Sequence, residues 1–369
     1  MARPRILLVN DDGPPSPSSP HILGLYTRLR AAGYPVRVVV PSSQKSWGGM
    51  AGSLAPIGVW YYYPRADDTR GEHSQSSWSA ERRAVAEGEE GEWLAVDASP
   101  TAATNIGLFN ARRFFPSDSA AASADSAELD IDLVLSGPNF GRNTGTAFAL
   151  ASGTVGAALA AALAGVRSIA LSYGHFSSLP PALAAASSAA EPASLAADAS
   201  SQVQALALDA TVRLVERLWT EWEAGVGTYA VNVPLGWTLR SPEIVWTRMW
   251  QSQYGQLYRP LRRPDAATQP QESASDLPPA KVDHPYLPAT APPPAQHLHF
   301  APVMPRLLAP ALEDCPEGTD VWALMNGMVS ITRLAPAFSE PLLRTDGGAP
   351  AAEQERPGSA GFTPQTWRL

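Results

Sequence analysis

Cysteine is almost absent from this 369-residue chain, which contains only Cys315. One cysteine excludes an intrachain disulfide framework and a zinc site built from thiolates. Basic residues are also in the minority, with 27 Lys and Arg against 35 Asp and Glu and a net charge of -8. This balance argues against general nucleic-acid binding through a basic surface. The sequence has no signal-peptide pattern and no apolar run of about 18 residues, so we expect a cytoplasmic protein with no membrane segment.

Two common nucleotide-binding patterns are missing as well. No GxGxxG fingerprint and no Gly-Lys-Ser/Thr of a phosphate-binding P-loop occur, which argues against a dinucleotide site and against phosphoryl transfer by a P-loop enzyme. The histidines show no metal-ligand spacing, so we expect them to be solvated or to serve in packing; they are His21, His73, His175, His284, His297 and His299.

What the chain does have is an alternation of strand and helix patterns. The buried strand 6–9 is followed by the helical face 21–34 and by a β-branched strand that ends at Pro41. This order is typical of a βαβ unit with parallel strands and a right-handed crossover. The later strands and helices repeat it, and the Trp-rich stretch 242–258 is predicted to be a strand that leaves the main sheet. The expected fold is therefore an α/β sandwich of three layers.

We expect residues 1–345 to form a single domain and residues 346–369 to form a tail. Four segments are rich in Ala, Ser, Pro or charge without a periodic apolar face, and they are interpreted as disordered insertions: 65–92, 117–128, 177–202 and 262–298. Such segments cannot bury enough apolar surface to offset the entropy lost on ordering.

Four loops follow predicted strands or open a helix, and we expect them to converge at one sheet edge: 10–13, 41–49, 136–145 and 151–156. Ligands bind at this carboxyl edge in open α/β sheets. The third loop offers Asn139 and Asn143 as neutral polar groups between flexible glycines. The fourth begins a helix with Ser152, which predicts either an anion site at the helix N-terminus or an ordinary N-cap.

Asp11 and Asp12 end the first strand, where they serve either turn chemistry or ligand binding. Two adjacent carboxylates, a hydroxyl and an Asn carbonyl form an all-oxygen set that suits Mg²⁺ or Mn²⁺. A cation of this kind beside a helix N-terminus suits the hydrolysis of phosphate esters. The expected nucleophile is a cation-activated water, which Asp11 or Asp12 would orient or deprotonate.

Five motifs, ILLVNDDG, VVVPSSQKS, DLVLSGPNFGRNTG, ASGTVGAA and MVSITRL, occur in the order found in the SurE family. The chain therefore resembles the survival-protein E nucleotidases and their acid-phosphatase relatives. This resemblance implies a Rossmann-like core and a C-terminal extension that takes part in forming homodimers or homotetramers. It also implies a divalent-cation-dependent phosphatase acting on nucleoside monophosphates (a 5′/3′-nucleotidase) or a broad acid phosphatase.

The resemblance also assigns site residues. The metal ligands fall on Asp11, Asp12, Ser46 and Asn139, with the two acids as the catalytic groups. The groups expected to bind phosphate or substrate are Asn10, Gly13, Asn143, Ser152, Gly153 and Thr154.

The chain departs from the family pattern at three places. Met50 replaces a His, Ala98-Ser99-Pro100 replaces Gly-Thr-Pro, and Ala151 replaces a Tyr. An alternative interpretation is therefore a catalytically degenerate protein that binds nucleotide or phosphate. A receiver-like signalling domain is disfavoured, because the strand that should end in a phosphoacceptor Asp ends in Ser136-Gly137.

Overall fold

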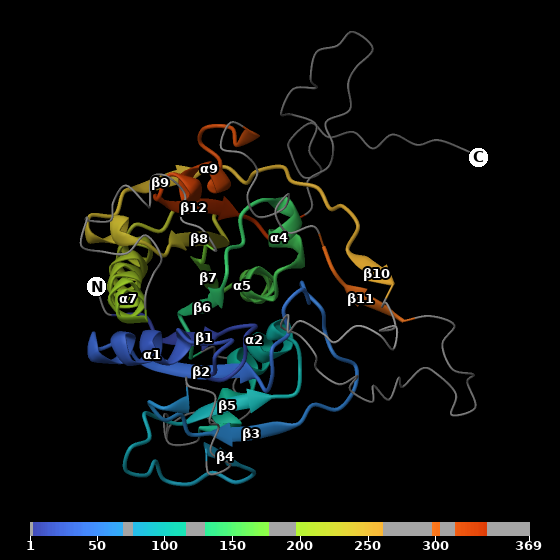
Figure 1. Ribbon diagram of the computed structural model, residues 1–369. Helices are drawn as coiled ribbons and strands as arrows, with labels where there is room; N and C mark the ends of the chain where they lie inside the picture. Colours follow the sequence, from blue (N-terminus) through green and yellow to red (C-terminus); the bar gives the residue numbers. More distant parts are fainter. Residues whose placement is uncertain are drawn as a thin grey trace, which may run out of the picture.

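The structure is a computed structural model that describes residues 3–68, 77–115, 130–176, 197–260, 297–302 and 314–337. At its centre is a ten-stranded sheet with the strand order β4-β3-β5-β2-β1-β6-β7-β8-β12-β9 (Figure 1). Helices cover both faces of this sheet, so the expected three-layer α/β fold is confirmed.

The middle of the sheet is parallel. Six neighbouring strands run in one direction: β5 (Trp93–Val96), β2 (Val36–Pro41), β1 (Ile6–Val9), β6 (Leu133–Phe140), β7 (Arg167–Gly174) and β8 (Thr228–Pro234). Their carboxyl ends therefore lie along one edge, where the predicted loops begin.

The outer strands break this parallel arrangement. At one side β3 (Val59–Tyr62) runs antiparallel to β5, and β4 (Trp78–Ser79) runs antiparallel to β3. At the other side β12 (Val329–Leu334) runs antiparallel to β8, and β9 (Ile244–Thr247) is parallel to β12.

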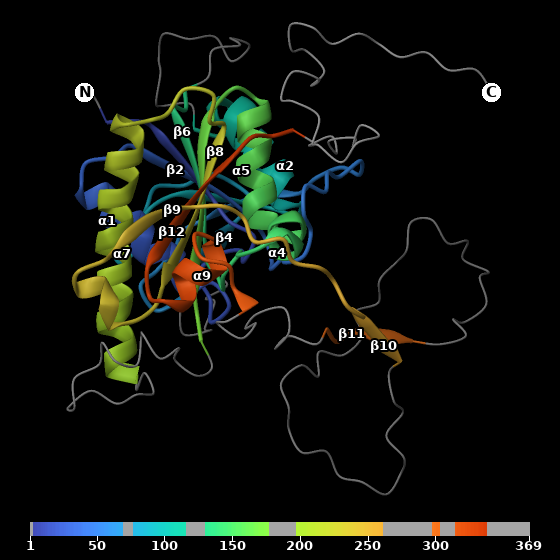
Figure 2. The same cartoon turned by 90° about the horizontal axis from the view of Figure 1, so that it is seen from above.

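Four long helices form the outer layers. On one face lie α1 (Ile22–Ala31) and α7 (Ala197–Thr220), and on the other lie α2 (Pro100–Phe109) and α5 (Gly153–Leu163) (Figure 2). Four short helices complete the described elements: α3 (Ala111–Phe114), α4 (Thr146–Ala151), α9 (Asp320–Met325) and the 3₁₀ helix η4 (Trp237–Arg240).

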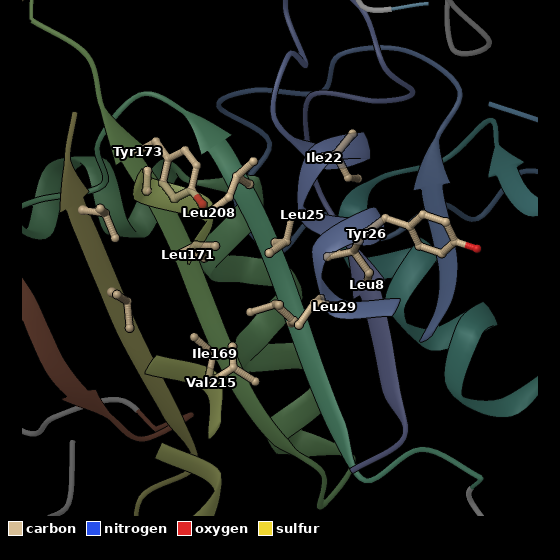
Figure 3. Packing of buried hydrophobic residues seen from close by; sticks show 14 of the residues in the cluster. Leu8, Ile22, Leu25, Tyr26, Leu29, Ile169, Leu171, Tyr173, Leu208 and Val215 are labelled. Carbon is tan, nitrogen blue, oxygen red and sulfur yellow. The ribbon is translucent and has the colours of Figure 1, made fainter. Parts of the chain in front are cut away.

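Strand β1 shows how the sequence builds these layers. Its four residues are fully buried, and successive side chains point to opposite faces. Ile6 and Leu8 belong to the core cluster beneath α1 and α7, where Leu8 lies near Leu25 and Leu29 (Figure 3). Leu7 and Val9 belong to the cluster beneath α2 and α5. A strand buried on both faces explains its continuous aliphatic sequence.

The stretch 242–258 differs from its prediction. Its first part is β9, which pairs with β12 inside the main sheet and places Thr247 Oγ1 2.8 Å from Thr332 Oγ1. Only its end leaves the sheet, because β10 (Tyr258–Pro260) pairs with β11 (Leu298–Phe300) as a separate two-stranded ribbon. The expected departing strand is thus two strands with different partners.

Most of the expected insertions, namely 117–128, 177–196 and 262–296, lie outside the described residues, as does the tail 346–369. The described part of 65–92 is built into the fold, since it contains β4 and the ion pair of Arg83 with Glu89 at 2.7 Å. Among the helices that the structure describes, none combines the length and the apolar character needed to cross a membrane.

Candidate active site

The four predicted loops meet around one cavity of about 230 Å³. Each loop contributes to its lining, with Asp11 from the first, Ser46 from the second, Asn139 and Asn143 from the third, and Ser152 from the fourth. The predicted convergence at the carboxyl ends of the parallel strands is therefore confirmed. Asn10, Asp12, Gly13, Gly153 and Thr154 lie next to these residues but not on the cavity wall.

Asn10 shapes the turn that follows β1. Its side-chain oxygen accepts a hydrogen bond from the Gly13 N–H at 3.1 Å, and its amide nitrogen donates to the Gly13 carbonyl at 2.7 Å and to Ser19 Oγ at 3.1 Å. Gly13 has φ +84°, which a residue with a side chain adopts at a cost. Both ends of the Asn10 amide are thus used inside the turn.

Asp11 is held by the fourth loop. Its Oδ1 accepts a hydrogen bond from Thr154 Oγ1 at 2.5 Å, and the backbone N–H groups of Gly153 and Thr154 lower its pKa. A Cβ on Gly153 would lie 2.8 Å from Asp11 Cβ, so glycine permits this approach. The main chain of Asp11 also anchors the second loop, because its carbonyl accepts from the Lys45 N–H at 2.7 Å.

Asp12 points toward the third loop. Its Oδ2 accepts a hydrogen bond from the Phe140 N–H at 2.7 Å, and Gln44 Nε2 lies 3.4 Å from its Oδ1. The two adjacent acids therefore turn to different neighbours, and each connects β1 to another loop of the site.

Both carboxyl groups are costly to ionise where they lie. Burial raises the pKa of Asp11, and burial together with the charge of Asp11 raises the pKa of Asp12 to about 7. Among the described residues no Lys, Arg or His forms an ion pair with either acid. Two buried carboxylates without a cationic partner make a site that gains stability by binding a cation.

The surrounding donors fit a hard divalent cation. No group of three or more His, Cys, Asp or Glu able to hold a metal occurs in the described part of the chain, so two carboxylates need neutral oxygen partners. Asn139 Nδ2 donates to the Gly141 carbonyl at 2.8 Å, which leaves the Asn139 side-chain oxygen as a ligand, and the Ser46 hydroxyl lines the same cavity. An all-oxygen set suits Mg²⁺ or Mn²⁺ better than a softer metal.

Two further predicted residues, Asn143 and Ser152, form hydrogen bonds within the fold. The Asn143 N–H donates to Asn232 Oδ1 at 2.8 Å, and Asn143 Nδ2 donates to Ser172 Oγ at 2.8 Å. Ser152 caps α5, since its Oγ accepts from the Val155 N–H at 3.1 Å. The ordinary N-cap interpretation of Ser152 therefore holds, and it does not prevent Ser152 from facing the cavity.

Two charged or titratable side chains were not predicted for the site. Arg142 and His175 both line the cavity, and His175 Nε2 lies 3.0 Å from His21 Nε2. Burial lowers the pKa of His175 to about 4 and that of His21 to about 3, so both rings are neutral at neutral pH. The sequence could have indicated His175, because it directly follows a predicted parallel strand, as Asp11 does.

The chain is similar in sequence to known proteins. A family model described as survival protein SurE matches residues 6–256. A Saccharomyces cerevisiae protein described as probable tubulin–tyrosine ligase PBY1 is 27% identical over 270 residues, which are 68% of this chain and 31% of that protein. The 5′-nucleotidase SurE 2 of Pyrobaculum aerophilum is 31% identical over 168 residues, which are 46% of this chain and 49% of that protein. The matches thus span about a third and about half of the length of these relatives.

A solved structure agrees with the fold. The SurE protein from Aquifex aeolicus is 22% identical and superposes with a TM-score of 0.50, covering 91% of this chain and 95% of that one. The sheet order, the converging loops and a family model that matches more than half of the residues lead to one assignment: this chain belongs to the SurE family.

Proposed function

We propose that this chain is a divalent-cation-dependent phosphomonoesterase that hydrolyses nucleoside monophosphates, as a 5′/3′-nucleotidase or as a broad acid phosphatase. Membership of the SurE family supports phosphatase or nucleotidase chemistry in general. The observation that carries the proposal is the buried pair Asp11 and Asp12, which has no ion-pair partner among the described residues. Ser46 and Asn139 line the same cavity as Asp11.

The proposed cation ligands are Asp11, Asp12, Ser46 and Asn139. When bound, Mg²⁺ or Mn²⁺ would supply Lewis-acid stabilisation of charge on the phosphoryl group. A carboxylate oxygen of Asp11 or Asp12 would orient the attacking water and accept its proton.

The remaining residues divide into two roles. Asn143 and Ser152 face the cavity, where they would contact phosphate oxygens. Asn10 and Gly13 form the turn that presents Asp11, while Gly153 and Thr154 contact Asp11 itself, so we assign these four to positioning. This assignment departs from the phosphate-binding role implied by the family motif.

A catalytically degenerate binding protein is the second candidate. Met50, which stands at the position of a family His, is 44% exposed and does not line the cavity, so no proton donor is present at that point. The presence of Asp11, Ser46 and Asn139 in one cavity supports the enzyme. Turnover separates the two.

The decisive experiment measures phosphate release from nucleoside 5′- and 3′-monophosphates and from p-nitrophenyl phosphate, with a chelator and with Mg²⁺ or Mn²⁺ restored. We expect activity to disappear with the chelator and to return with the metal. D11N and D12N should lower turnover at least about 100-fold, because each removes a charge that binds the cation. D67N, at an exposed acid, is the matched control. A folded wild-type protein that binds nucleotide without turnover would establish the degenerate candidate instead.

A further inference from the structure

Arg142 is a buried cation in the cavity wall, and its charge is not neutralised by a carboxylate among the described residues. The residue is 7% exposed, and its Nε has no hydrogen-bond partner in the part of the chain that the structure describes. Nη1 lies 3.5 Å from Met325 Sδ, and the guanidinium carbon lies 5.3 Å from the centroid of the Phe176 ring. The thiol of Cys315 is also near enough to interact with the charge of Arg142. These soft and apolar neighbours offset little of the cost of burying the charge.

Several other arginines of the fold have guanidinium groups that are paired with carboxylates. Five of them make two hydrogen bonds each to a carboxylate, in the pairs Arg5–Asp132, Arg82–Glu92, Arg83–Glu89, Arg112–Asp130 and Arg333–Glu223. The buried acid on α9, Asp320, is not available to Arg142 in the same way. Its two oxygens accept the N–H groups of Gly145, Trp250 and Val321 at 2.8 to 2.9 Å.

Burial lowers the pKa of Arg142 to about 10, which leaves the side chain charged at neutral pH. A buried, charged guanidinium in a cavity, with no carboxylate partner among the described residues, can bind an oxyanion from outside the chain, because planar N–H donors match phosphate and carboxylate.

Arg142 and Asp11 both line the cavity, but different elements hold them there. The neighbours of Arg142 follow β7 and end α9, at Phe176 and Met325. The neighbours of Asp11 and Asp12 come from the start of α5 and the end of β6, at Thr154 and Phe140. Arg142 is therefore held by contacts with the residues after β7 and with α9, whereas Asp11 is held by the start of α5.

We propose that Arg142 binds a second oxyanion, carried by the leaving group of the substrate. The preferred substrates are then phosphomonoesters that bear a further phosphate or carboxylate, with a nucleoside 3′,5′-bisphosphate as the simplest nucleotide of this kind. This inference rests on the proposed phosphomonoesterase function and narrows its substrate class.

The test compares substrates that differ in the second anion. Values of kcat/KM are measured for a nucleoside 3′,5′-bisphosphate, for phosphoglycolate and for p-nitrophenyl phosphate, in the wild-type protein, R142Q and R142K. We expect R142Q to lose about 10- to 100-fold more kcat/KM with the doubly anionic substrates than with p-nitrophenyl phosphate, as for the loss of a charge-assisted hydrogen bond. R142K should recover part of the loss, and R30Q, at an exposed arginine, should show no such difference.

The two doubly anionic substrates distinguish a second phosphate from a carboxylate as the preferred group. If R142Q lost kcat/KM equally with all three substrates, Arg142 would act on the scissile phosphate and the inference would be overturned. Unchanged kcat/KM in R142Q would also overturn it. R142M, whose thioether suits the contact with Met325, serves if R142Q fails to fold.

Calorimetric binding separates this inference from the proposed function. The wild-type protein should bind the nucleoside 3′,5′-bisphosphate more tightly than the 5′-monophosphate, and R142Q should remove that difference. A wild-type protein that turns over no substrate yet shows this Arg142-dependent preference would defeat the phosphatase and retain the anion site. Equal affinity for the two nucleotides would overturn the inference whether or not the protein hydrolyses either.

Discussion

The Thr154 hydroxyl stabilises ionised Asp11. Burial raises the pKa of Asp11, and the hydroxyl, which donates to Asp11 Oδ1 at 2.5 Å, offsets part of this rise. T154V removes the hydrogen-bond donor without a large change in side-chain shape. The free-energy cost of ionising Asp11 therefore rises, and the site binds the cation more weakly. We expect kcat/KM to fall about 10- to 100-fold, as for a lost hydrogen bond to a charged group, while T154S stays within about threefold of the wild type.

The measurement for Thr154 is the Mn²⁺ concentration that gives half-maximal hydrolysis of p-nitrophenyl phosphate, together with calorimetric Mn²⁺ binding. T154V should require more Mn²⁺ than T154S. Equal Mn²⁺ requirements in the two variants would show that the hydroxyl does not act on the site.

Asp12 makes the metal-free protein sensitive to pH. Its folded pKa of about 7 lies above the ordinary value of 3.8, so between these values the folded state binds more protons than the unfolded state. The free energy of unfolding therefore decreases as pH rises through this window. D12N removes the effect and keeps an acceptor for the Phe140 N–H. In a chelator we expect D12N to be more stable than the wild type at pH 8 by roughly 1–3 kcal/mol, and by less at pH 5.

Chemical denaturation at the two pH values measures this difference, with D67N as the control at an exposed acid. Added Mg²⁺ should stabilise the wild-type protein more than D12N, because the cation compensates the same charge. A D12N effect that is the same at pH 5 and pH 8 would contradict the prediction.

The residues that could be predicted from the sequence are those at the ends of recognisable strands within local motifs. Asp11, Ser46, Asn139 and Ser152 are of this kind, and all line the cavity. Arg142 lies inside one of these motifs, but its burial depends on Met325 and Phe176, which local pattern does not place beside it.

Helix α5 approaches the second loop too closely for any side chain larger than hydrogen. A Cβ on Gly156 would lie 2.4 Å from the Gly49 carbonyl oxygen, and the Gly49 N–H donates to the Ala151 carbonyl at 2.9 Å. G156A should therefore push the second loop away from α5, destabilise the fold by about 1–3 kcal/mol as overpacking does, and reduce activity by displacing Ser46.

The matched control is G52A, because a Cβ there meets nothing within 4 Å. Thermal unfolding and kcat/KM are measured for both variants. If G156A behaved like G52A, the close contact between α5 and the second loop would not be needed for the site.

Strand and helix patterns predicted the parallel elements well because each carries its own periodicity. Strand β1 and helix α1 are examples, with apolar positions that match one buried strand and one helical face. The edge arrangement was missed at β9, because its pairing with β12 joins segments about 85 residues apart in the chain. Pairing over such distances depends on tertiary packing rather than on local sequence.

The described part of the molecule joins an α/β core to a projecting ribbon. Strands β10 and β11 lie away from the sheet, and all six of their residues are exposed (Figure 2). Phe300 of the ribbon contacts Trp47 of the cavity wall, with ring centroids 4.7 Å apart. A two-stranded ribbon by itself is marginally stable in water, so we expect other protein surface to cover it.

We propose that a second copy of this chain covers the ribbon, in the homodimer or homotetramer that the family resemblance implies. Leu298 is 60% exposed on β11, and Leu163 at the end of α5 is 63% exposed. L298E should shift the mass measured by analytical ultracentrifugation from a multiple of the chain mass toward that of one chain, while L163E leaves it unchanged. Because Phe300 rests on Trp47, L298E should also lower kcat/KM. A wild-type protein that sediments as a single chain would refute the oligomer, and an L298E oligomer of unchanged mass would place its interface elsewhere.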